Sequence, residues 1–259
     1  MRNTKPVYHF LPGKKTLSIA TVGCNLKCGF CQNWQISQCK PENAKNLIIK
    51  PEEVVNQAVK NKLKIISYTY TEPTIFYEYM LDIAKLAKKK RIKNITVTNG
   101  FINPAPLNLL CDYLDASNID LKAFDEDFYE MTCKARLKPV LESIKLMKSR
   151  GVWIELTNLI IPGLNDSVEK ISKLVDWIEK NLGKDVPLHF SAFYPQYKMF
   201  NLPKTGEEIL KKARRIAMGK GLRYVYTGNI DDEEGNNTYC PKCKKLLIKR
   251  RYTLLQKII

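Results

Sequence analysis

The sequence of 259 residues contains no run of about 18 apolar residues, the length that a membrane-spanning helix requires. Its first ten residues, MRNTKPVYHF, lack the apolar core of a signal peptide. No repeat, low-complexity tract or linker divides the chain, and the 44% hydrophobic content is enough for one large buried core. We therefore expect one large domain in the cytoplasm, without a membrane partner.

Acidic residues are fewer than basic ones. The sequence has 26 Asp and Glu and 43 Lys and Arg, which gives a net charge of +17. The basic residues cluster at 85–93 and 242–251. Such clusters are typical of proteins that bind nucleic acid or an acidic protein, and also of lysine-rich solvated surfaces in proteins from hot environments. No RNA-binding motif interleaves aromatic residues with these lysines, so we favour the solvated surface. An RNA substrate is an alternative that only the charge supports.

Strand and helix patterns alternate along the chain. The predicted strands cover residues 16–22, 65–70, 94–100, 117–124, 152–161, 187–195 and 222–228. The predicted helices cover residues 51–61, 74–90, 103–114, 125–134, 137–151, 166–182 and 208–221. Capping boxes of Asp166 with Glu169 and of Thr205 with Glu208 are expected to start the last two helices. Six strand–helix units and a seventh strand predict an α/β fold, a partial (βα)6 TIM-like barrel rather than a closed eight-stranded one.

Ligands of such folds gather at the C-terminal ends of the parallel strands. Distinctive polar residues of this chain fall at or near those ends. They are a cysteine loop after the first strand, Thr71 and Glu72 after the second, Asn99 after the third, Asp120 and Lys122 in the fourth, Asn158 in the fifth and His189 in the sixth.

The cysteine loop, TVGCNLKCGFCQNW, carries Cys24, Cys28 and Cys31. Cysteines in a reducing compartment are metal ligands or buried thiols more often than disulfides. A structural zinc site needs four ligands, usually in two pairs, and no fourth Cys or His stands next to these three; Cys39 comes eight residues later. A 4Fe–4S cluster fits better, because three cysteines hold three corners and leave the fourth iron open for a bound molecule.

The pattern Cys24-x3-Cys28-x-Phe30-Cys31 resembles the signature of the radical S-adenosylmethionine (SAM) superfamily. The wider GCNLKCGFCQNW resembles the branch of the pyruvate formate-lyase activating enzymes, and residues 5–38 are most similar to the radical SAM member of the AmmeMemoRadiSam system. The motifs QNW, TNG, DLK and IIPGLND follow in the expected order, so that the resemblance covers residues 5–250. It implies an oxidoreductase that reductively cleaves SAM to a 5′-deoxyadenosyl radical, which abstracts hydrogen from a substrate.

The same resemblance implies which residues serve the cofactors. The 4Fe–4S cluster is expected on Cys24, Cys28 and Cys31. Residues expected to help hold SAM are Phe30, Thr71, Glu72, Asn99, Asp120 and Lys122. Asn158 and His189 are candidates for contact with SAM or substrate. Relatives carry a Gly-Gly-Glu turn where this chain has Tyr70-Thr71-Glu72, so both glycines are replaced.

Each of these residues also has a purely structural interpretation. Glu72 suits the N-terminus of a helix, and Asn99 suits a turn. Asp120 and Lys122 share one face of a strand and suit an internal ion pair. His189 suits a hydrogen-bonded position in the core.

Two further cysteines, Cys240 and Cys243, form CPKC in the tail and resemble half of a zinc or rubredoxin-type knuckle, with Lys244 where such knuckles carry Gly. A metal there needs two more ligands. Candidate partners are Cys39, Cys111 and Cys133, although the last two lie in apolar helical contexts typical of packing residues. Longer members of the subfamily begin with an additional cysteine-containing segment. The pair is therefore either a half site, or the native start lies upstream of Met1.

We expect a lead-in segment at 1–15, a radical SAM core at 16–229 and a basic tail at 230–259. An electron donor is required, which we expect to be an acidic ferredoxin or flavodoxin. Two substrates compete: a protein glycine, which would become a glycyl radical, and an unidentified substrate handled with Memo-type and AMMECR-type partners. A rival of another class is a non-catalytic iron–sulfur or zinc regulatory protein.

Overall fold

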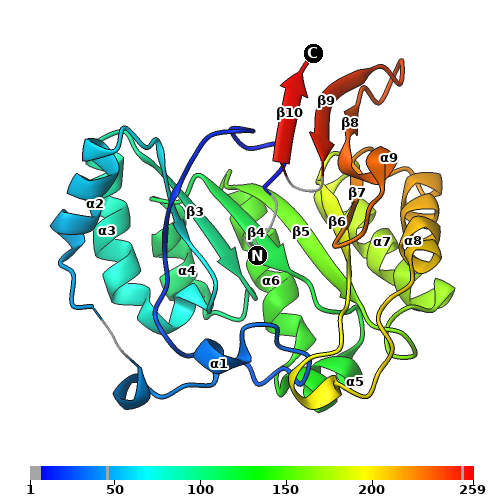
Figure 1. Ribbon diagram of the computed structural model, residues 1–259, viewed down its shortest axis with the longest axis horizontal. Coiled ribbons are helices and arrows are strands. Elements are labelled where there is room, and N and C mark those ends of the chain that lie inside the picture. Colours follow the sequence, from blue (N-terminus) through cyan, green and yellow to red (C-terminus); the bar gives the residue numbers. More distant parts are fainter. Residues whose placement is uncertain (1–6, 45–46, 252–253) are drawn as a thin grey trace.

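The computed structural model describes residues 7–44, 47–251 and 254–259. Its centre is a seven-stranded sheet in which every strand pairs in parallel with its neighbours in the sequence (Figure 1). Within the described residues β1 and β7 do not pair with each other, so the barrel is open, as predicted. The strands are β1 (Leu17–Ile19), β2 (Ile65–Tyr68), β3 (Lys93–Thr98), β4 (Ala116–Asp120), β5 (Trp153–Ile160), β6 (Leu188–Ala192) and β7 (Val225–Gly228).

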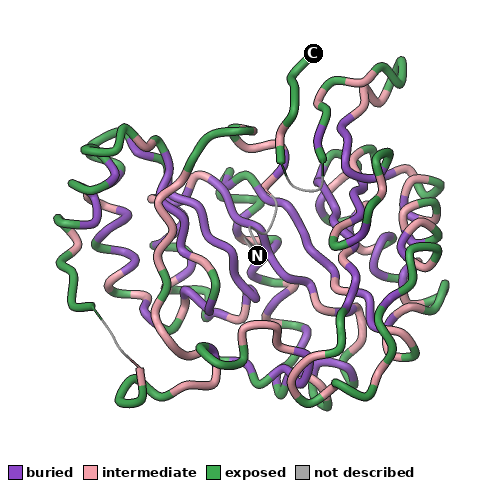
Figure 2. Tube along the Cα trace, viewed as in Figure 1, coloured by how far each residue is buried: buried purple, intermediate pink, exposed green. Residues whose placement is uncertain are grey.

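One long helix follows each of the first six strands, which confirms the predicted strand–helix units. These helices are α2 (Pro51–Lys60), α3 (Tyr77–Lys89), α4 (Pro104–Cys111), α6 (Leu137–Ser149), α7 (Val168–Leu182) and α8 (Glu207–Gly219). Apart from α4, which contains no charged residue, each turns an apolar stripe toward the sheet and a charged face toward solvent, as α7 does with Ile171, Val175 and Ile178 (Figure 2). Strands β2 to β7 are mostly buried on both sides, which is typical of parallel sheets, whereas β1 at the edge is half-buried.

Short helical turns lie between these units. They are α1 (Trp34–Ser37), η1 (Pro41–Asn43), η2 (Pro73–Phe76), α5 (Glu126–Phe128), the π-helical η3 (Tyr129–Cys133), η4 (Tyr197–Met199) and α9 (Glu233–Asn236). In Figure 1, α1 and α5 lie beside the C-terminal ends of the strands, where the cysteine loop also runs. Among the described residues, no helix is long and apolar enough to cross a bilayer.

Both predicted capping boxes are wrong. Helix α7 is capped by Ser167, whose hydroxyl accepts from the Lys170 amide at 3.2 Å, whereas Asp166 accepts from the amide of Gly163. Helix α8 begins after Gly206. Thr205 instead donates its hydroxyl to the Ile160 carbonyl at 2.6 Å, because it is buried against the end of β5. The cap of α7 is thus one residue later than predicted, and a tertiary contact replaces the predicted cap of α8.

The tail contains more structure than the sequence predicted. Strands β8 (Thr238–Tyr239), β9 (Leu246–Arg251) and β10 (Leu254–Ile258) form an antiparallel sheet in the order β10-β9-β8, at the opposite end of the barrel from α1 (Figure 1). Arg250 fixes this sheet to the segment before β1, because its buried guanidinium donates to the Tyr8 carbonyl at 2.9 Å and, within the small sheet, to Thr238 at 2.7 Å. The guanidinium also lies 5.8 Å from the centre of the Tyr226 ring of β7. Strand β9 is short and half of its residues are charged, so its sequence shows no clear alternation of apolar and polar residues.

Candidate functional site

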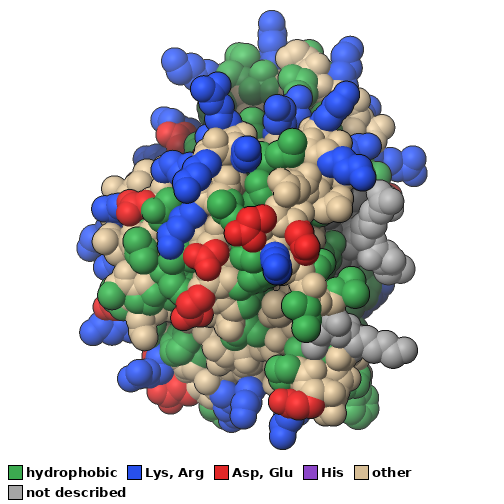
Figure 3. Space-filling view, turned by 90° about the vertical axis from the view of Figure 1, so that its left-hand side faces the viewer, with side chains coloured by type: hydrophobic (Ala, Val, Ile, Leu, Met, Phe, Trp, Pro, Cys, Tyr) green, Lys and Arg blue, Asp and Glu red, His purple; other side chains and the backbone are tan. Residues whose placement is uncertain are grey.

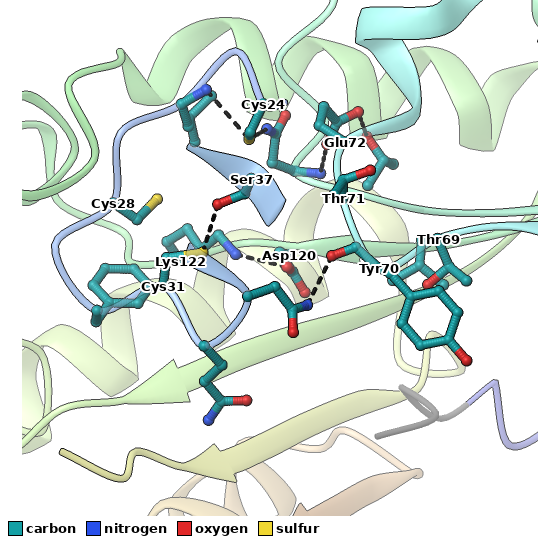
Figure 4. A pocket seen from close by; sticks show the side chains of 17 residues that line it. Cys24, Cys28, Cys31, Ser37, Thr69, Tyr70, Thr71, Glu72, Asp120 and Lys122 are labelled. Carbon is teal, nitrogen blue, oxygen red and sulfur yellow. Dashed lines mark hydrogen bonds and ion pairs between the residues drawn. The ribbon is translucent and has the colours of Figure 1, made fainter. Parts of the chain in front are cut away.

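A cavity opens at the C-terminal ends of β1 to β4, with an empty volume of about 890 Å³ that includes its open mouth. The cysteine loop forms one wall, and the ends of β2, β3 and β4 form the others (Figure 4). Every residue expected to hold the cluster or SAM lines this cavity. These residues are Cys24, Cys28, Phe30, Cys31, Thr71, Glu72, Asn99, Asp120 and Lys122.

The cysteine loop is held mainly by its own backbone and by a neighbouring turn. The amide of Gly23 donates to the Ile36 carbonyl at 2.8 Å and folds α1 back over the loop. Gly23 has φ +105, and a Cβ there would lie 2.8 Å from the Ile75 side chain, so only glycine fits. The amides of Lys27 and Gly29 donate to carbonyls of the η3 turn at 3.0 and 3.1 Å. The loop therefore has a defined shape before any ligand binds.

The three thiols face this cavity in different surroundings. Cys24 Sγ accepts from the Leu26 amide at 3.4 Å and from Asn99 Nδ2 at 3.7 Å, and Cys31 Sγ lies 3.1 Å from the Ser37 hydroxyl. Burial raises the pKa of Cys24 to about 12, so this thiol stays protonated until a metal displaces the proton. Cys28 is buried, and interaction with the nearby thiol of Cys133 in η3 lowers the pKa of Cys28.

The donor set suits a polynuclear cluster. In residues 7–44, 47–251 and 254–259, no three Cys, His, Asp or Glu side chains come close enough together to hold one metal ion. A 4Fe–4S cube does not require such closeness, because each thiolate binds an iron at a separate corner. Three thiols around a cavity that continues beyond them therefore fit three corners, with space beside the fourth for a small molecule.

Glu72 supports the strand ends from within. Its Oε1 accepts from the Thr74 amide at 3.0 Å, the Thr74 hydroxyl at 2.7 Å and the Thr98 hydroxyl at 2.7 Å, and its Oε2 accepts from the Asn99 amide at 2.8 Å. Burial raises the pKa of this carboxyl, and the four donors oppose that rise. The carboxylate thus ties the end of β2 to the end of β3, and it also caps η2 as the structural interpretation expected.

Asn99 connects this network to the cysteine loop. Its Oδ1 accepts from the Phe101 amide at 2.8 Å, which is the turn expected from the sequence. Its Nδ2 donates to Asn25 Oδ1 at 2.8 Å and points toward Cys24 Sγ. The Thr71 hydroxyl donates to the Thr21 carbonyl at 2.6 Å, so the second wall is also joined to the loop.

Asp120 and Lys122 form an ion pair within the cavity wall, with Lys122 Nζ 2.6 Å from Asp120 Oδ2. Burial lowers the pKa of Lys122, but the carboxylate of Asp120 and the sulfur of Cys28 outweigh burial and leave the pKa raised. The ammonium also lies 5.9 Å from the centre of the Phe30 ring. A fixed positive charge therefore stands beside the cysteine loop and suits an anionic group such as a carboxylate.

Asn158 and His189 do not line the cavity, and the expectation that they contact SAM or substrate is not supported. Asn158 Nδ2 donates to the carbonyls of Leu121 and Lys122 at 2.8 and 3.1 Å, so it fixes the segment that carries the ammonium. His189 lies near the start of β6, where Nε2 is 2.8 Å from Glu155 Oε2. His189 is thus a core residue at the far end of the barrel.

Sequence reasoning missed several residues that shape the site. Asn165, in the IIPGLND motif, donates to the Lys122 carbonyl at 3.0 Å beside Asn158. Asn33, in QNW, donates to the Tyr70 carbonyl at 2.7 Å. Tyr70 has φ +70, so the chain keeps a glycine-like backbone conformation at this position with a bulky residue. The motifs QNW and IIPGLND drew attention to the segments that contain these asparagines, but they did not indicate which backbone carbonyls the asparagines bind.

The tail cysteines lie in the turn between β8 and β9. The Cys240 carbonyl accepts from the Lys244 amide at 2.9 Å, and Lys244 takes φ +59, the conformation for which knuckles usually carry glycine. Within the part of the chain that the structure describes, no third Cys, His, Asp or Glu completes a metal site with them. Cys133 lies against the cysteine loop instead, so its candidacy as a tail partner is wrong.

Comparison with known proteins gives three kinds of relative. A model of the Radical SAM superfamily matches residues 18–178. An uncharacterised protein of Methanocaldococcus jannaschii is 46% identical over 98% of this chain and 75% of its own length. The pyruvate formate-lyase-activating enzyme of Clostridium pasteurianum is 25% identical over 82% of this chain and 91% of its own length. In fold, Streptococcus suis SuiB bound to S-adenosylmethionine is similar at a TM-score of 0.65 and 16% identity, over 84% of this chain and 51% of that one.

Proposed function

The chain belongs to the radical SAM superfamily, whose enzymes use a 4Fe–4S cluster and SAM. We propose that it is an activating-enzyme-like member in which Cys24, Cys28 and Cys31 hold the cluster and the adjoining cavity holds SAM. Its reaction would be the reductive cleavage of SAM and the abstraction of hydrogen from a substrate. The observation that carries the proposal is the convergence of all nine expected residues on one cavity.

When bound, the cluster and SAM supply one-electron cleavage of a carbon–sulfur bond and radical hydrogen abstraction. The chain supplies binding and orientation. Cys24, Cys28 and Cys31 would hold three irons of the cluster and would leave the fourth open for SAM. Lys122 offers a buried ammonium that suits the carboxylate, held in place by Asp120. Phe30 and Thr71 would border the bound molecule, while Glu72 keeps Asn99 facing the loop.

We also propose that an acidic ferredoxin or flavodoxin reduces the cluster. Lys and Arg side chains spread over the face of the molecule drawn in Figure 3, around a smaller group of Asp and Glu. A net charge of +17 would attract an acidic donor over long distances. On the resemblance of residues 5–38, we further propose a cytoplasmic role with Memo-type and AMMECR-type partners.

A glycyl-radical activase is the second candidate, because several relatives carry that activity in their names. They include a putative glycyl-radical enzyme activating enzyme of M. jannaschii, 28% identical over 78% of this chain. The test is transfer of deuterium from the glycine Cα of a polypeptide into 5′-deoxyadenosine. The remaining rival, a non-catalytic iron–sulfur or zinc protein, would need the cysteines but not the ion pair in the cavity wall.

The proposal is tested by anaerobic reconstitution with iron and sulfide. We expect about four irons and four sulfides per chain, and an electron paramagnetic resonance (EPR) spectrum of the dithionite-reduced protein that changes when SAM is added. Cys24→Ala, Cys28→Ala and Cys31→Ala should each lose the cluster, whereas Cys111→Ala, which removes a buried thiol of α4, should keep it. Zinc in place of iron, or a spectrum indifferent to SAM, would contradict the proposal.

A further inference from the structure

A fourth thiol lies against the cysteine loop. Cys133 is fully buried at the end of η3, its carbonyl accepts from the amide of the residue before Cys28, and the two thiols influence each other's pKa. We propose that Cys133 is a positioning residue for the cluster. Its S–H group donates a hydrogen bond to the Cys28 sulfur when Cys28 ligates iron, and thereby raises the reduction potential of the cluster. This inference rests on the proposed function, because it requires a cluster on Cys28.

Backbone hydrogen bonds fix the two cysteines side by side. The residue before Cys28, Lys27, donates its amide to the Cys133 carbonyl at 3.0 Å, and the residue after it, Gly29, donates to the Thr132 carbonyl at 3.1 Å. Both bonds join main chain to main chain. Cys28 can therefore turn its side chain toward an iron while the backbone of Cys133 stays beside it. The pairing depends on the fold rather than on one side-chain rotamer.

The turn that carries Cys133 is itself held on its other side. Tyr129 is the first residue of η3, and its hydroxyl accepts from the Lys122 amide at 3.0 Å at the end of β4. The Ala135 amide donates back to the Tyr129 carbonyl at 3.1 Å and closes the turn. Such π-helical turns are rare and occur frequently at functional sites. Here the turn bridges the cysteine loop and the strand that presents the cavity ion pair.

The effect on the cluster follows from charge. Reduction adds one negative charge, which spreads over the cluster and its sulfur ligands, so a hydrogen-bond donor to a ligand sulfur stabilises the reduced form more than the oxidised form. Cys133 is 0% exposed and Cys28 is 8% exposed, so water has little access to replace a missing donor. Loss of the thiol should therefore make the cluster harder to reduce.

The experiment is an EPR-monitored redox titration of the reconstituted protein in four forms. At the wild-type midpoint, Cys133→Ala should lower the ratio of reduced to oxidised cluster by about fivefold, which corresponds to the loss of one hydrogen bond. Cys133→Ser keeps a donor and should hold the ratio at or above that of the wild type. Cys111→Ala is the matched control and should leave it unchanged. Cys133→Val, which also lacks a donor, replaces the alanine variant if that variant takes up no cluster.

A second readout detects the proton itself. The Leu26 amide, the Asn99 side chain and the Ser37 hydroxyl place exchangeable hydrogens near the cluster in every form. After reconstitution in deuterated water, electron–nuclear double resonance should show one further exchangeable hydrogen near the reduced cluster in the wild type and Cys133→Ser that is absent from Cys133→Ala. An unchanged ratio in Cys133→Ala, or an equal fall in Cys133→Ser, would overturn the inference and leave the proposed function standing. Failure of the wild type to bind a 4Fe–4S cluster would overturn both.

Discussion

Glu72→Gln is the substitution that best separates support of the site from direct contact with SAM. Glutamine keeps the size of the side chain but replaces one carboxylate oxygen by an NH₂ group. If the amide oxygen takes the place of Oε1, it can still accept from Thr74 and Thr98. The NH₂ group then faces the Asn99 amide, which in the wild type donates to Glu72 Oε2 and in the variant meets a second donor instead of an acceptor.

The cost can be estimated from these contacts. A buried amide left without an acceptor costs about 1–3 kcal/mol, and the remaining three hydrogen bonds lose the strengthening that a charged acceptor gives. Removal of a buried charge acts in the opposite direction, because burial already raises the pKa of Glu72. We expect a net loss of about 2 kcal/mol in the free energy of unfolding at pH 7.

The assay is urea unfolding of the cluster-free protein followed by circular dichroism. Glu78→Gln, the same substitution at an exposed position of α3, is the matched control and should change the free energy by less than about 0.5 kcal/mol. A Glu72→Gln protein as stable as the wild type, yet unable to bind SAM after reconstitution, would refute this reasoning and make Glu72 a direct ligand.

Three further predictions concern the ion pair, the far end of the barrel and the electron donor. Lys122→Met should cost roughly 3 kcal/mol in urea unfolding, because the Asp120 carboxylate stays buried without its ammonium, and Asp120→Asn in the same chain should restore most of that loss. Burial lowers the pKa of His9 to about 4, so the fold holds it neutral while the unfolded chain protonates near pH 6.5. Stability should therefore fall as pH drops from 6.5 to 4, by up to about 2 kcal/mol for this partly exposed ring, and thermal melts of His9→Gln should lose that part of the slope. Stopped-flow reduction by an acidic ferredoxin should slow by about tenfold between low salt and 0.5 M salt, and a rate independent of salt would contradict electrostatic docking.

Local sequence patterns were enough to predict the order of strands and helices and the residues that line the cavity at the strand ends. The cysteine spacing and the alternation of strands and helices are properties of short segments, and they placed Cys24, Glu72, Asn99 and Lys122 at strand ends that meet in a parallel sheet.

Contacts between distant segments were not predictable in this way. The pairing of Cys28 with Cys133 depends on how η3 packs against the loop, and an apolar context alone made Cys133 look like a packing residue. His189 was placed correctly in the sixth strand, but it lies near the N-terminal end of β6, whereas the cavity lies at the C-terminal ends of the strands. Thr205 does not cap α8, because its hydroxyl donates to the buried carbonyl of Ile160 at the end of β5.

The most direct test of the central claim is the formation of 5′-deoxyadenosine. The protein is reconstituted anaerobically with iron and sulfide, reduced with dithionite and supplied with SAM, and the products are measured by mass spectrometry. The account predicts 5′-deoxyadenosine and methionine from the wild type and from Cys111→Ala, and neither from Cys28→Ala. A wild-type protein that carries an intact, reduced 4Fe–4S cluster and leaves SAM whole would contradict it.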